Sequence, residues 1–179
     1  MIYIFLAEGF EEIEALCPLD LMRRAGLSVT TVGIGGKHIT GSHNITVTAD
    51  ITENEFDGSD AQMIFLPGGM PGTLNLGNCD TVIKAIKDAT AKDIYVSAIC
   101  AAPSILGDMG LLMGKEAICY PGFEDRLTGA TISDKRVVRD GKIITAAGMG
   151  AALDLGLEIV ALFCGNDKSL ALKAAVIYD

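Results

Sequence analysis

The sequence contains no tryptophan, only two histidines, and fewer basic than acidic residues. The 14 lysines and arginines against 23 aspartates and glutamates give a formal net charge of −9. A protein with such a field repels phosphate backbones and anionic membrane surfaces. We therefore expect that neither nucleic acid nor a membrane is a partner.

Long apolar runs and paired cysteines are also absent. No apolar stretch approaches the length of a transmembrane helix, and the first residues carry neither a basic leader nor a cleavage site. The five cysteines are scattered and include no Cys-x-x-Cys pair that would indicate a zinc site or a redox dithiol. These absences predict a reduced, cytoplasmic protein that binds no metal or other cofactor.

The pattern of apolar residues indicates the fold class. Half of the 179 residues are hydrophobic, which is enough to fill the core of a single domain. Short apolar runs alternate with segments of helical spacing, and this alternation predicts an α/β fold with a doubly wound, mostly parallel sheet. Strands are expected at 1–7, 27–34, 63–66, 94–99 and 116–120, helices at 11–25, 79–91, 151–164 and 169–177, and hairpins at 37–48 and 136–145.

One cysteine occupies a position that favours chemistry. Cys100 follows the predicted strand 94–99 and precedes a turn of small residues, Ala101-Ala102-Pro103, that opens into a helical pattern. The unpaired N–H groups and the positive dipole end of that helix favour a thiolate over a thiol. Cys100 is therefore our candidate nucleophile, and we interpret the other four cysteines as inert small hydrophobic residues.

Other candidate residues follow neighbouring strands of the predicted sheet. Ligands of doubly wound sheets bind beyond the carboxyl ends of the strands, where the sequence places the acidic segment 11–14 and Gly68-Gly69. The N–H groups of the two glycines and of Ala101 can stabilise a developing oxyanion. A buried, protonated carboxyl group from the first helix can donate a hydrogen bond to the thiolate or move its proton.

An imidazole partner for the thiol is not evident. Cysteine enzymes that transfer acyl groups usually pair the thiol with a histidine. The two histidines, His38 and His43, both fall in the predicted hairpin at 37–48, and we interpret them as surface residues without a partner. The sequence therefore argues against the hydrolysis of peptides or amides.

Several motifs, in this order along the chain, resemble the ThiJ/PfpI superfamily and cover essentially the whole sequence. They are G-F-E-E-I-E-A at 9–15, M-R-R-A-G at 22–26, L-P-G-G at 66–69, A-I-C-A-A-P at 98–103 and G-M-G at 148–150. The resemblance is strongest to the branch that contains the Parkinsonism-associated redox chaperone/deglycase and its bacterial relatives. It implies a three-layer, flavodoxin-like sandwich related to class I glutamine amidotransferase domains, and a homodimer.

The resemblance also assigns roles to residues of the predicted site. Cys100 matches the oxidisable nucleophile of the family, and Glu14 matches the carboxyl group that forms a hydrogen bond with it. The backbone groups of Gly68, Gly69 and Ala101 match the oxyanion hole. The resemblance thus implies a cysteine site with a carboxyl partner.

Two further positions lie at the periphery of that site. Arg24 matches an arginine near the dimer interface that helps to hold an anion near the nucleophile. Tyr120 stands where some members of the family have a histidine. Because a phenol donates a hydrogen bond but is a poor base at neutral pH, this departure bears on every activity that needs the imidazole, including proteolysis and the glyoxalase reaction.

These observations lead to three hypotheses. The first is a stress-response protein in which the Cys100 thiolate, stabilised by Glu14, reacts with an oxidant or a small reactive carbonyl, as in a glyoxalase or deglycase. The second is a redox sensor or holding chaperone without enzymatic activity, which depends on oxidation of Cys100. The third, an intracellular protease or amidase, is disfavoured by the missing histidine.

Overall fold

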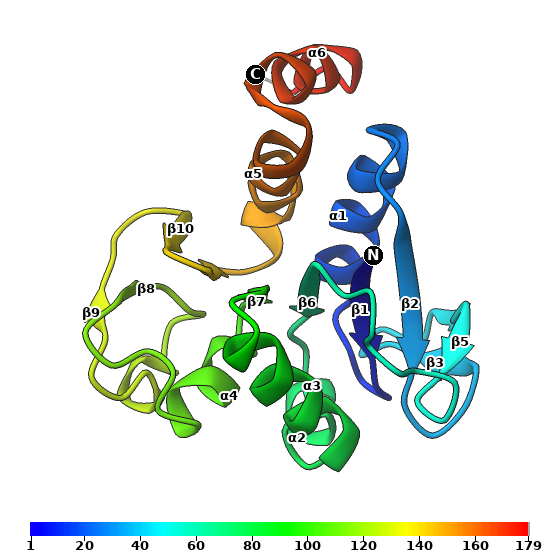
Figure 1. Ribbon diagram of the computed structural model, residues 1–179, viewed down its shortest axis with the longest axis vertical. Helices are drawn as coiled ribbons and strands as arrows, with labels where there is room; N and C mark the ends of the chain where they lie inside the picture. Colours follow the sequence, from blue (N-terminus) through cyan, green and yellow to red (C-terminus); the bar gives the residue numbers. More distant parts are fainter. Residues whose placement is uncertain (179) are drawn as a thin grey trace.

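A seven-stranded sheet forms the centre of the molecule (Figure 1). The computed structural model describes residues 1–178. All neighbouring strands of the sheet are parallel except the β10–β11 hairpin at one edge. In spatial order the strands are β10 (Val137–Asp140), β11 (Ile143–Ala146), β7 (Tyr95–Ile99), β6 (Met63–Leu66), β1 (Ile2–Leu6), β2 (Val29–Gly33) and β5 (Ile51–Thr52).

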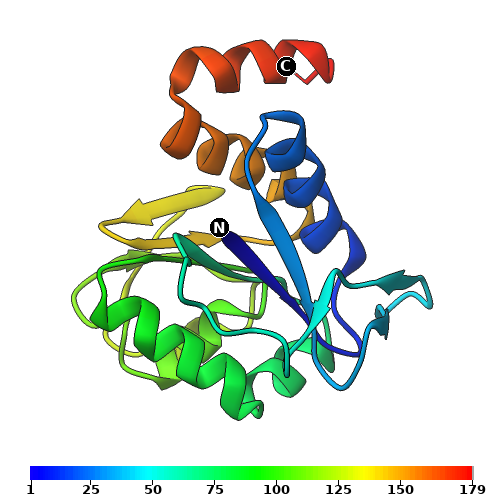
Figure 2. The same ribbon diagram turned by 45° about the vertical axis from the view of Figure 1, so that its right-hand side comes forward.

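Helices cover both faces of the sheet, so the α/β sandwich with three layers predicted from the sequence is confirmed (Figure 2). One face carries α1 (Glu12–Arg24), α5 (Ala152–Cys164) and α6 (Asn166–Ala175), and the other carries α2 (Gly72–Gly77), α3 (Asp80–Ala91) and α4 (Pro103–Asp108). Among residues 1–178, none of the helices is both long enough and apolar enough to span a bilayer.

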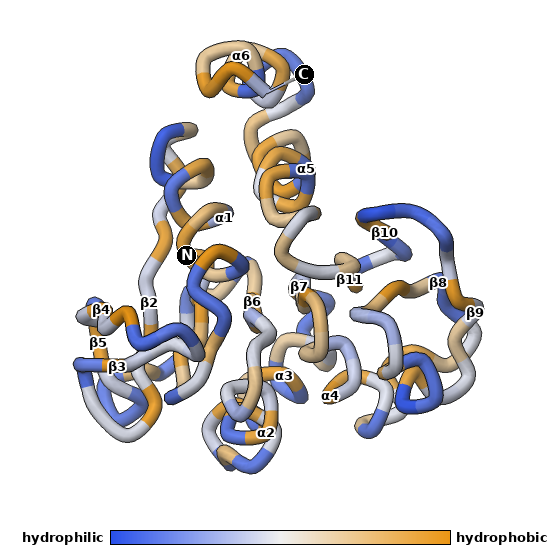
Figure 3. Tube along the Cα trace, turned by 180° about the vertical axis from the view of Figure 1, so that it is seen from behind, coloured by the Kyte–Doolittle hydropathy of each residue, from blue (hydrophilic) through white to orange (hydrophobic). Residues whose placement is uncertain are grey.

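Two hydrophobic cores result from this layering, one on each side of the sheet. Along β1, Ile2 and Ile4 belong to the core under α1 and α5, whereas Tyr3 and Phe5 belong to the core under α3. Every residue of β1 is buried, as expected for a central strand of a parallel sheet. Figure 3 shows that α5 is also predominantly hydrophobic, because it packs against α1, α6 and the sheet.

The helix α1 packs closely on α5. It continues through Pro18 without interruption. A Cβ atom added to Gly156 of α5 would lie 2.6 Å from Leu21 Cδ1 and 3.1 Å from Pro18 Cα. The glycine therefore permits the close contact that fixes α1, and with it the acidic residues of its first turn, on the sheet.

Two short strands differ from the expectations. β5 lies in the acidic segment after residue 50 because Asp50 Oδ2 accepts a hydrogen bond of 2.8 Å from the Thr31 N–H of β2. This is a contact between distant residues, which the local pattern does not reveal. The strand expected at 116–120 is only β8 (Glu116–Ala117), which pairs with β9 (Thr131–Ile132) outside the main sheet. The predicted hairpins are confirmed, the first as β3 (His38–Thr40) and β4 (Thr46–Thr48).

The carboxyl ends of β1, β6, β7 and β11 lie next to one another. In the register of the sheet, Leu66 lies opposite Ala98, and Ala146 lies opposite Ile99. The segments that follow these strands therefore meet at one edge of the sheet. These segments are residues 7–14, residues 67–72, Cys100 and residues 147–149.

Candidate active site

Cys100 lies in a sharp turn immediately after β7. Its φ angle is +65°, in the left-handed region that residues other than glycine seldom adopt. Two hydrogen bonds hold the turn, from the Cys100 N–H to the Ala146 carbonyl oxygen at 2.9 Å and from the Tyr120 N–H to the Cys100 carbonyl oxygen at 2.8 Å. This strained strand-to-helix turn has the geometry of a nucleophile elbow, which presents one side chain above the end of the sheet.

The carboxyl group of Glu14 reaches this turn from the first turn of α1. Its side chain is buried, with 1% of the residue exposed, and Oε2 accepts a hydrogen bond of 3.0 Å from the Gly68 N–H. Burial raises the pKa of Glu14 to about 7, although hydrogen bonds with the Cys100 thiol and with the backbone N–H groups of Gly68 and Met149 oppose this shift. Near neutral pH the carboxyl group is therefore able both to hold and to release a proton.

The environment of the thiol differs from the sequence-based expectation of a lowered pKa. Burial and the adjacent Glu14 carboxylate raise the pKa of Cys100 to about 12, whereas the N–H groups of Ala101 and Gly69 lower it. Burial and the neighbouring charge thus outweigh the N-terminus of the short helix α4. If one proton moves from the thiol to Glu14, the total charge of the pair is unchanged: a thiolate then lies beside a carboxylic acid. The negative charge of Glu14 that disfavours the thiolate is then absent, and the Glu14 O–H can donate a hydrogen bond to the sulfur.

The three predicted oxyanion-hole residues have different roles in the structure. The N–H groups of Gly69 and Ala101 form hydrogen bonds with the Cys100 sulfur. The Gly68 N–H, which we expected to stabilise an oxyanion, donates instead to Glu14 Oε2. A Cβ atom on Gly68 would lie 2.6 Å from Glu14 Oε2 and 2.7 Å from Cys100 Cβ, so only glycine permits the two side chains to approach.

The two peripheral residues lie in different parts of the molecule. Tyr120 is adjacent to the elbow, with 51% of the residue exposed. Arg24 lies ten residues after Glu14 on α1, about 15 Å further along the helix axis. Its Nε is 2.7 Å from Asp20 Oδ2. Within one chain the structure therefore brings Tyr120, but not Arg24, to Cys100.

The other cysteines lie away from this constellation. Cys119 is buried, as predicted, in the core opposite to α1, and burial raises the pKa of its thiol to about 11. Cys17 and Cys79 are half-buried, and burial raises the pKa of Cys17. Cys164, which we expected to be buried, is exposed at the end of α5. Among the cysteines whose pKa is shifted within residues 1–178, Cys100 is the one whose thiol forms a hydrogen bond with a carboxyl group.

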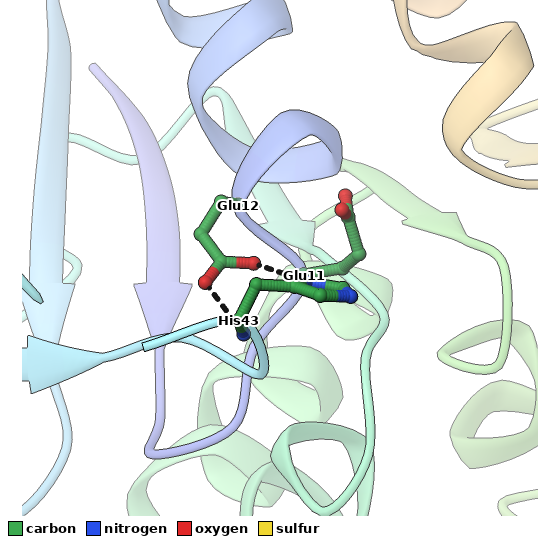
Figure 4. Close-up of side chains that lie close together, drawn as sticks. All are labelled: Glu11, Glu12 and His43. Carbon is green, nitrogen blue, oxygen red and sulfur yellow. Dashed lines mark hydrogen bonds and ion pairs between the residues drawn. The ribbon is translucent and has the colours of Figure 1, made fainter. Parts of the chain in front are cut away.

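A second buried carboxylate, Glu12, binds the β3–β4 hairpin (Figure 4). Its Oε1 accepts a hydrogen bond of 2.8 Å from the His43 N–H, and its Oε2 lies 3.1 Å from His43 Nδ1. Although burial raises it, hydrogen bonds from His43 and Ile45 lower the pKa of Glu12 below its ordinary value. His43 thus has a partner that the sequence did not reveal, and neither histidine is among the groups that shift the pKa of Cys100.

The same cluster is the place where residues 1–178 could hold a metal ion. Ligand atoms of Glu11, Glu12 and His43 lie within 4.8 Å of one another. However, Glu11 Oε2 already accepts a hydrogen bond of 2.7 Å from the Glu14 N–H as the N-cap of α1, and both oxygens of Glu12 face His43. The structure therefore explains these side chains by their role in folding.

Sequence reasoning missed the part of the site that follows β11. The Met149 N–H donates to Glu14, and the backbone of Gly148 lies beside Cys100. The sequence signal was the G-M-G motif at 148–150, but nothing local indicates that it meets residues 14 and 100. The parallel pairing of β11 with β7 brings it there.

Comparison with known proteins identifies relatives of the whole chain. The family model "DJ-1/PfpI family" matches residues 1–162. "Parkinson disease protein 7 homolog" of Danio rerio is 32% identical over 97% of this chain and 95% of its own length. "Protein DJ-1 homolog B" of Arabidopsis thaliana is 34% identical, but this chain spans only 41% of its length. A Caenorhabditis elegans protein named "Glutathione-independent glyoxalase DJR-1.2" is 28% identical over 92% of this chain and 89% of its own length.

Solved structures show the same fold. The structure "Toxoplasma gondii DJ-1, oxidized" superposes with a TM-score of 0.95 at 28% identity and covers 99% of this chain and 97% of its own. DJ-1beta of Drosophila melanogaster superposes with a TM-score of 0.94, also at 28% identity and with the same coverage of both chains. Together with the elbow cysteine at the end of β7, these matches show that the chain belongs to the DJ-1/PfpI family.

Proposed function

We propose that this chain is a cysteine-dependent stress-response protein that converts small reactive carbonyl compounds, as a glyoxalase or deglycase does. The observation that carries the proposal is the contact between the elbow thiol of Cys100 and the buried carboxyl group of Glu14, whose raised pKa suits proton transfer near neutral pH. The glyoxalase name of one relative supports the same substrate class.

The chemistry begins with a proton transfer from the Cys100 thiol to Glu14. The thiolate then adds to the aldehyde carbon, so that a C–S bond forms while the π electrons of the C=O bond move to oxygen. N–H groups such as those of Gly69 and Ala101 stabilise the oxyanion, and Glu14 returns its proton to it, which completes a hemithioacetal. For a 2-oxoaldehyde, Glu14 then moves a proton from the sulfur-bearing carbon to the neighbouring carbon, while the hydroxyl proton passes to the neighbouring oxygen, which gives a 2-hydroxy thioester. Water adds to the thioester carbonyl group, the C–S bond breaks, and the 2-hydroxy acid and the Cys100 thiol are released.

The test is the turnover of methylglyoxal to lactate by the purified protein. We expect Cys100→Ser to abolish turnover and to leave the fold unchanged. Cys17→Ser is the matched control, because Cys17 is a half-buried cysteine of α1 that is not among the groups that shift the pKa of Cys100 or Glu14, and it should retain full activity. Full turnover by Cys100→Ser would contradict the proposal.

The same contact supports a second candidate function, a redox sensor or holding chaperone. The Cys100 thiolate attacks one oxygen of a peroxide, so that an S–O bond forms, the O–O bond breaks and hydroxide leaves, and a second peroxide converts the sulfenic acid to a sulfinic acid. One related structure is named as an oxidized form. Mass spectrometry after mild peroxide treatment should find Cys100 modified before the other cysteines, and an unmodified Cys100 would exclude this function.

Proteolysis is the function that the site supports least. Tyr120, whose N–H bonds to the elbow, stands where some members of the family have a histidine, and neither histidine of this chain is among the groups that shift the pKa of Cys100. Attack on an amide needs a base and an acid for a poor leaving group. We therefore propose no protease or amidase activity, and hydrolysis of casein by the wild type but not by Cys100→Ser would overturn this choice.

We also propose a cytoplasmic homodimer that binds no nucleic acid. The net charge of −9 argues against nucleic acid. Ile13 on α1 and Ile45 in the hairpin are 48% and 54% exposed, and they line one shallow groove together with Leu16 and Leu153. An apolar surface of this kind suits a second copy. Light scattering should give the mass of a dimer, and Ile13→Glu should shift it toward the monomer.

A further inference from the structure

A cavity lies at the edge of the sheet opposite to Cys100. Its volume is about 230 Å³, and it is bounded by α3 and by the loop 53–61 that follows β5. Ala61 and Ile94, which line it, come just before β6 and β7, at the amino ends of these strands. None of the four segments around Cys100 contributes to its lining within the described chain, so the cavity is separate from the candidate active site.

The interior of the cavity is apolar. Ala85 and Ala89 are buried and lie four residues apart, so their methyl groups share one face of α3. Phe56 of the loop and Ile64 of β6 supply larger apolar surfaces. Because a cavity of about 150 Å³ is enough for benzene, this cavity can hold one six-membered ring or a branched chain of similar size.

The aromatic wall is held in place by the protein itself. The Phe56 ring lies edge-on to Tyr3 and Phe5, with centroid distances of 4.8 Å and 5.0 Å. A Cβ atom added to Gly58 would lie 2.8 Å from Phe56 Cζ, so glycine permits the loop to approach the ring. A wall that is already ordered lowers the entropic cost of binding a ligand.

On the helix side, lysines outnumber carboxylates around the rim of the cavity. Lys84, Asp88 and Lys92 all line it. Lys84 Nζ lies 2.5 Å from Asp88 Oδ2, and this hydrogen bond, together with the charges of Lys84 and Lys92, lowers the pKa of Asp88. Because two ammonium groups share one carboxylate, the helix side keeps a positive charge.

On the loop side, the rim is negative. Glu53 Oε2 accepts a hydrogen bond of 2.8 Å from the Gly35 N–H, and Asp57 Oδ1 accepts one of 2.8 Å from the Ser59 N–H. Within residues 1–178, neither carboxylate takes part in an ion pair, whereas Lys37 in the same region pairs with Glu55 outside the cavity. The two sides of the rim therefore carry opposite charges above an apolar interior.

We propose that this cavity binds a free amino acid with an apolar side chain of the size of phenylalanine or leucine. The side chain fills the apolar interior, the α-carboxylate faces the lysines of α3, and the α-ammonium faces the carboxylates of the loop. A zwitterion complements both sides of the rim, whereas an amine or a carboxylic acid of the same shape complements one side. The inference does not depend on the proposed carbonyl chemistry.

The first test is calorimetric titration of the full chain with L-phenylalanine. We expect saturable binding at one site per chain. The analogue 2-phenylethylamine lacks the carboxylate, and 3-phenylpropionate lacks the ammonium group. Each should bind roughly two- to five-fold more weakly, the effect of one exposed ion pair.

Two variants locate the site. Lys92→Gln should weaken the binding of L-phenylalanine by roughly two- to five-fold and leave that of 2-phenylethylamine unchanged. Lys87→Gln is the matched control, because Lys87 is an exposed lysine of α3 outside the cavity. Ala85→Leu fills the interior and should abolish binding, whereas Ala91→Leu, on the exposed end of α3, should retain it.

The outcomes keep the inference apart from the proposed function. Cys100→Ser should bind L-phenylalanine as the wild type does. Absence of saturable binding to the wild type, or equal affinities for the three ligands, would overturn the inference. Unchanged binding in a folded Ala85→Leu variant would also overturn it, and Lys92→Gln decides the question if Ala85→Leu does not fold, because Lys92 is exposed.

Discussion

The first turn of α1 carries two buried carboxyl groups, Glu12 and Glu14, whose surroundings shift their pKa values in opposite directions. Both residues are nearly inaccessible to solvent, with 4% of Glu12 and 1% of Glu14 exposed, and burial acts to raise the pKa of each. On the hairpin side, Glu12 receives hydrogen bonds from His43 and Ile45, and its pKa is lowered. On the cysteine side, burial and the charge of Glu11 outweigh the hydrogen bonds with the Cys100 thiol and the backbone, so the pKa of Glu14 is raised to about 7.

The balance between burial and the hydrogen bonds to a carboxyl group therefore decides whether that group serves folding or chemistry. Glu12 holds two segments together as a permanent anion. Glu14 is positioned to exchange a proton with Cys100.

The largest effect is expected from Glu14→Gln. The amide has almost the same shape but cannot accept or release a proton, so kcat/KM for methylglyoxal should fall by about 10²- to 10⁴-fold, the usual contribution of a general acid–base. Steady-state kinetics measure this, with Glu12→Gln as the matched variant that should remain active. Equal losses in the two variants would contradict the division between them.

The pH dependence of stability should have opposite signs on the two sides. The pKa of Glu14 rises from 4.5 to about 7 on folding, so its contribution to the free energy of unfolding decreases as the pH rises through that window, by at most about 1.4 kcal/mol per pH unit. The pKa of Glu12 is lowered, so its contribution is lost as the pH falls through its folded pKa.

Urea unfolding of the wild type, Glu14→Gln and Glu12→Gln from pH 4 to pH 8 checks this pair of signs. Glu14→Gln should flatten the decline between pH 4.5 and pH 7. An unchanged slope in that variant would show that Glu14 does not titrate in this window.

Glu12→Ala should destabilise the fold without affecting the cysteine. It leaves the His43 and Ile45 N–H groups without their acceptor, so the free energy of unfolding should fall by about 1–3 kcal/mol. Urea denaturation measures the change. Asp20→Asn, which removes an exposed ion pair with Arg24, is the control and should change stability by less than about 1 kcal/mol. A loss no larger than that of the control would mean that Glu12 does not hold the hairpin.

The smallest effect is expected from Met149→Pro. Met149 begins a 3₁₀ turn, where proline fits, and the extended Gly148 before it is compatible with a following proline. The substitution removes the N–H that donates to Glu14, so the pKa of Glu14, read from the pH–rate profile, should rise further by less than about one unit. Met149→Leu keeps the N–H and should leave the profile unchanged; a shift in both variants would assign the effect to the side chain.

How much of this could be predicted depends on whether the information is local. The buried strands and the helix of Glu14 follow from the periodicity of neighbouring apolar residues, and they predict the α/β fold. The Asp50–Thr31 contact that makes β5, and the Glu12–His43 contact, join residues far apart in the chain. No spacing reveals them.

The candidate site divides in the same way. The elbow position of Cys100 follows from the strand and the small residues around it, and the partnership with Glu14 was implied by family resemblance alone. The raised pKa of the thiol could not be predicted, because it depends on burial and on the charge of a side chain 86 positions away. The same is true of the hydrogen bond that the Gly68 N–H gives to Glu14.

Four chain segments meet at one edge of the sheet, so the surroundings of Cys100 are complete only after the last of these segments has been synthesised and has folded. Cys100 leaves the ribosome before residues 147–149. A partly synthesised chain therefore lacks the Met149 N–H that donates to Glu14 and the Gly148 backbone that lies beside Cys100. Until β11 pairs with β7, the thiol is one ordinary cysteine among five. Selective chemistry at this sulfur is therefore a property that only the finished fold possesses, and a chain that unfolds loses it.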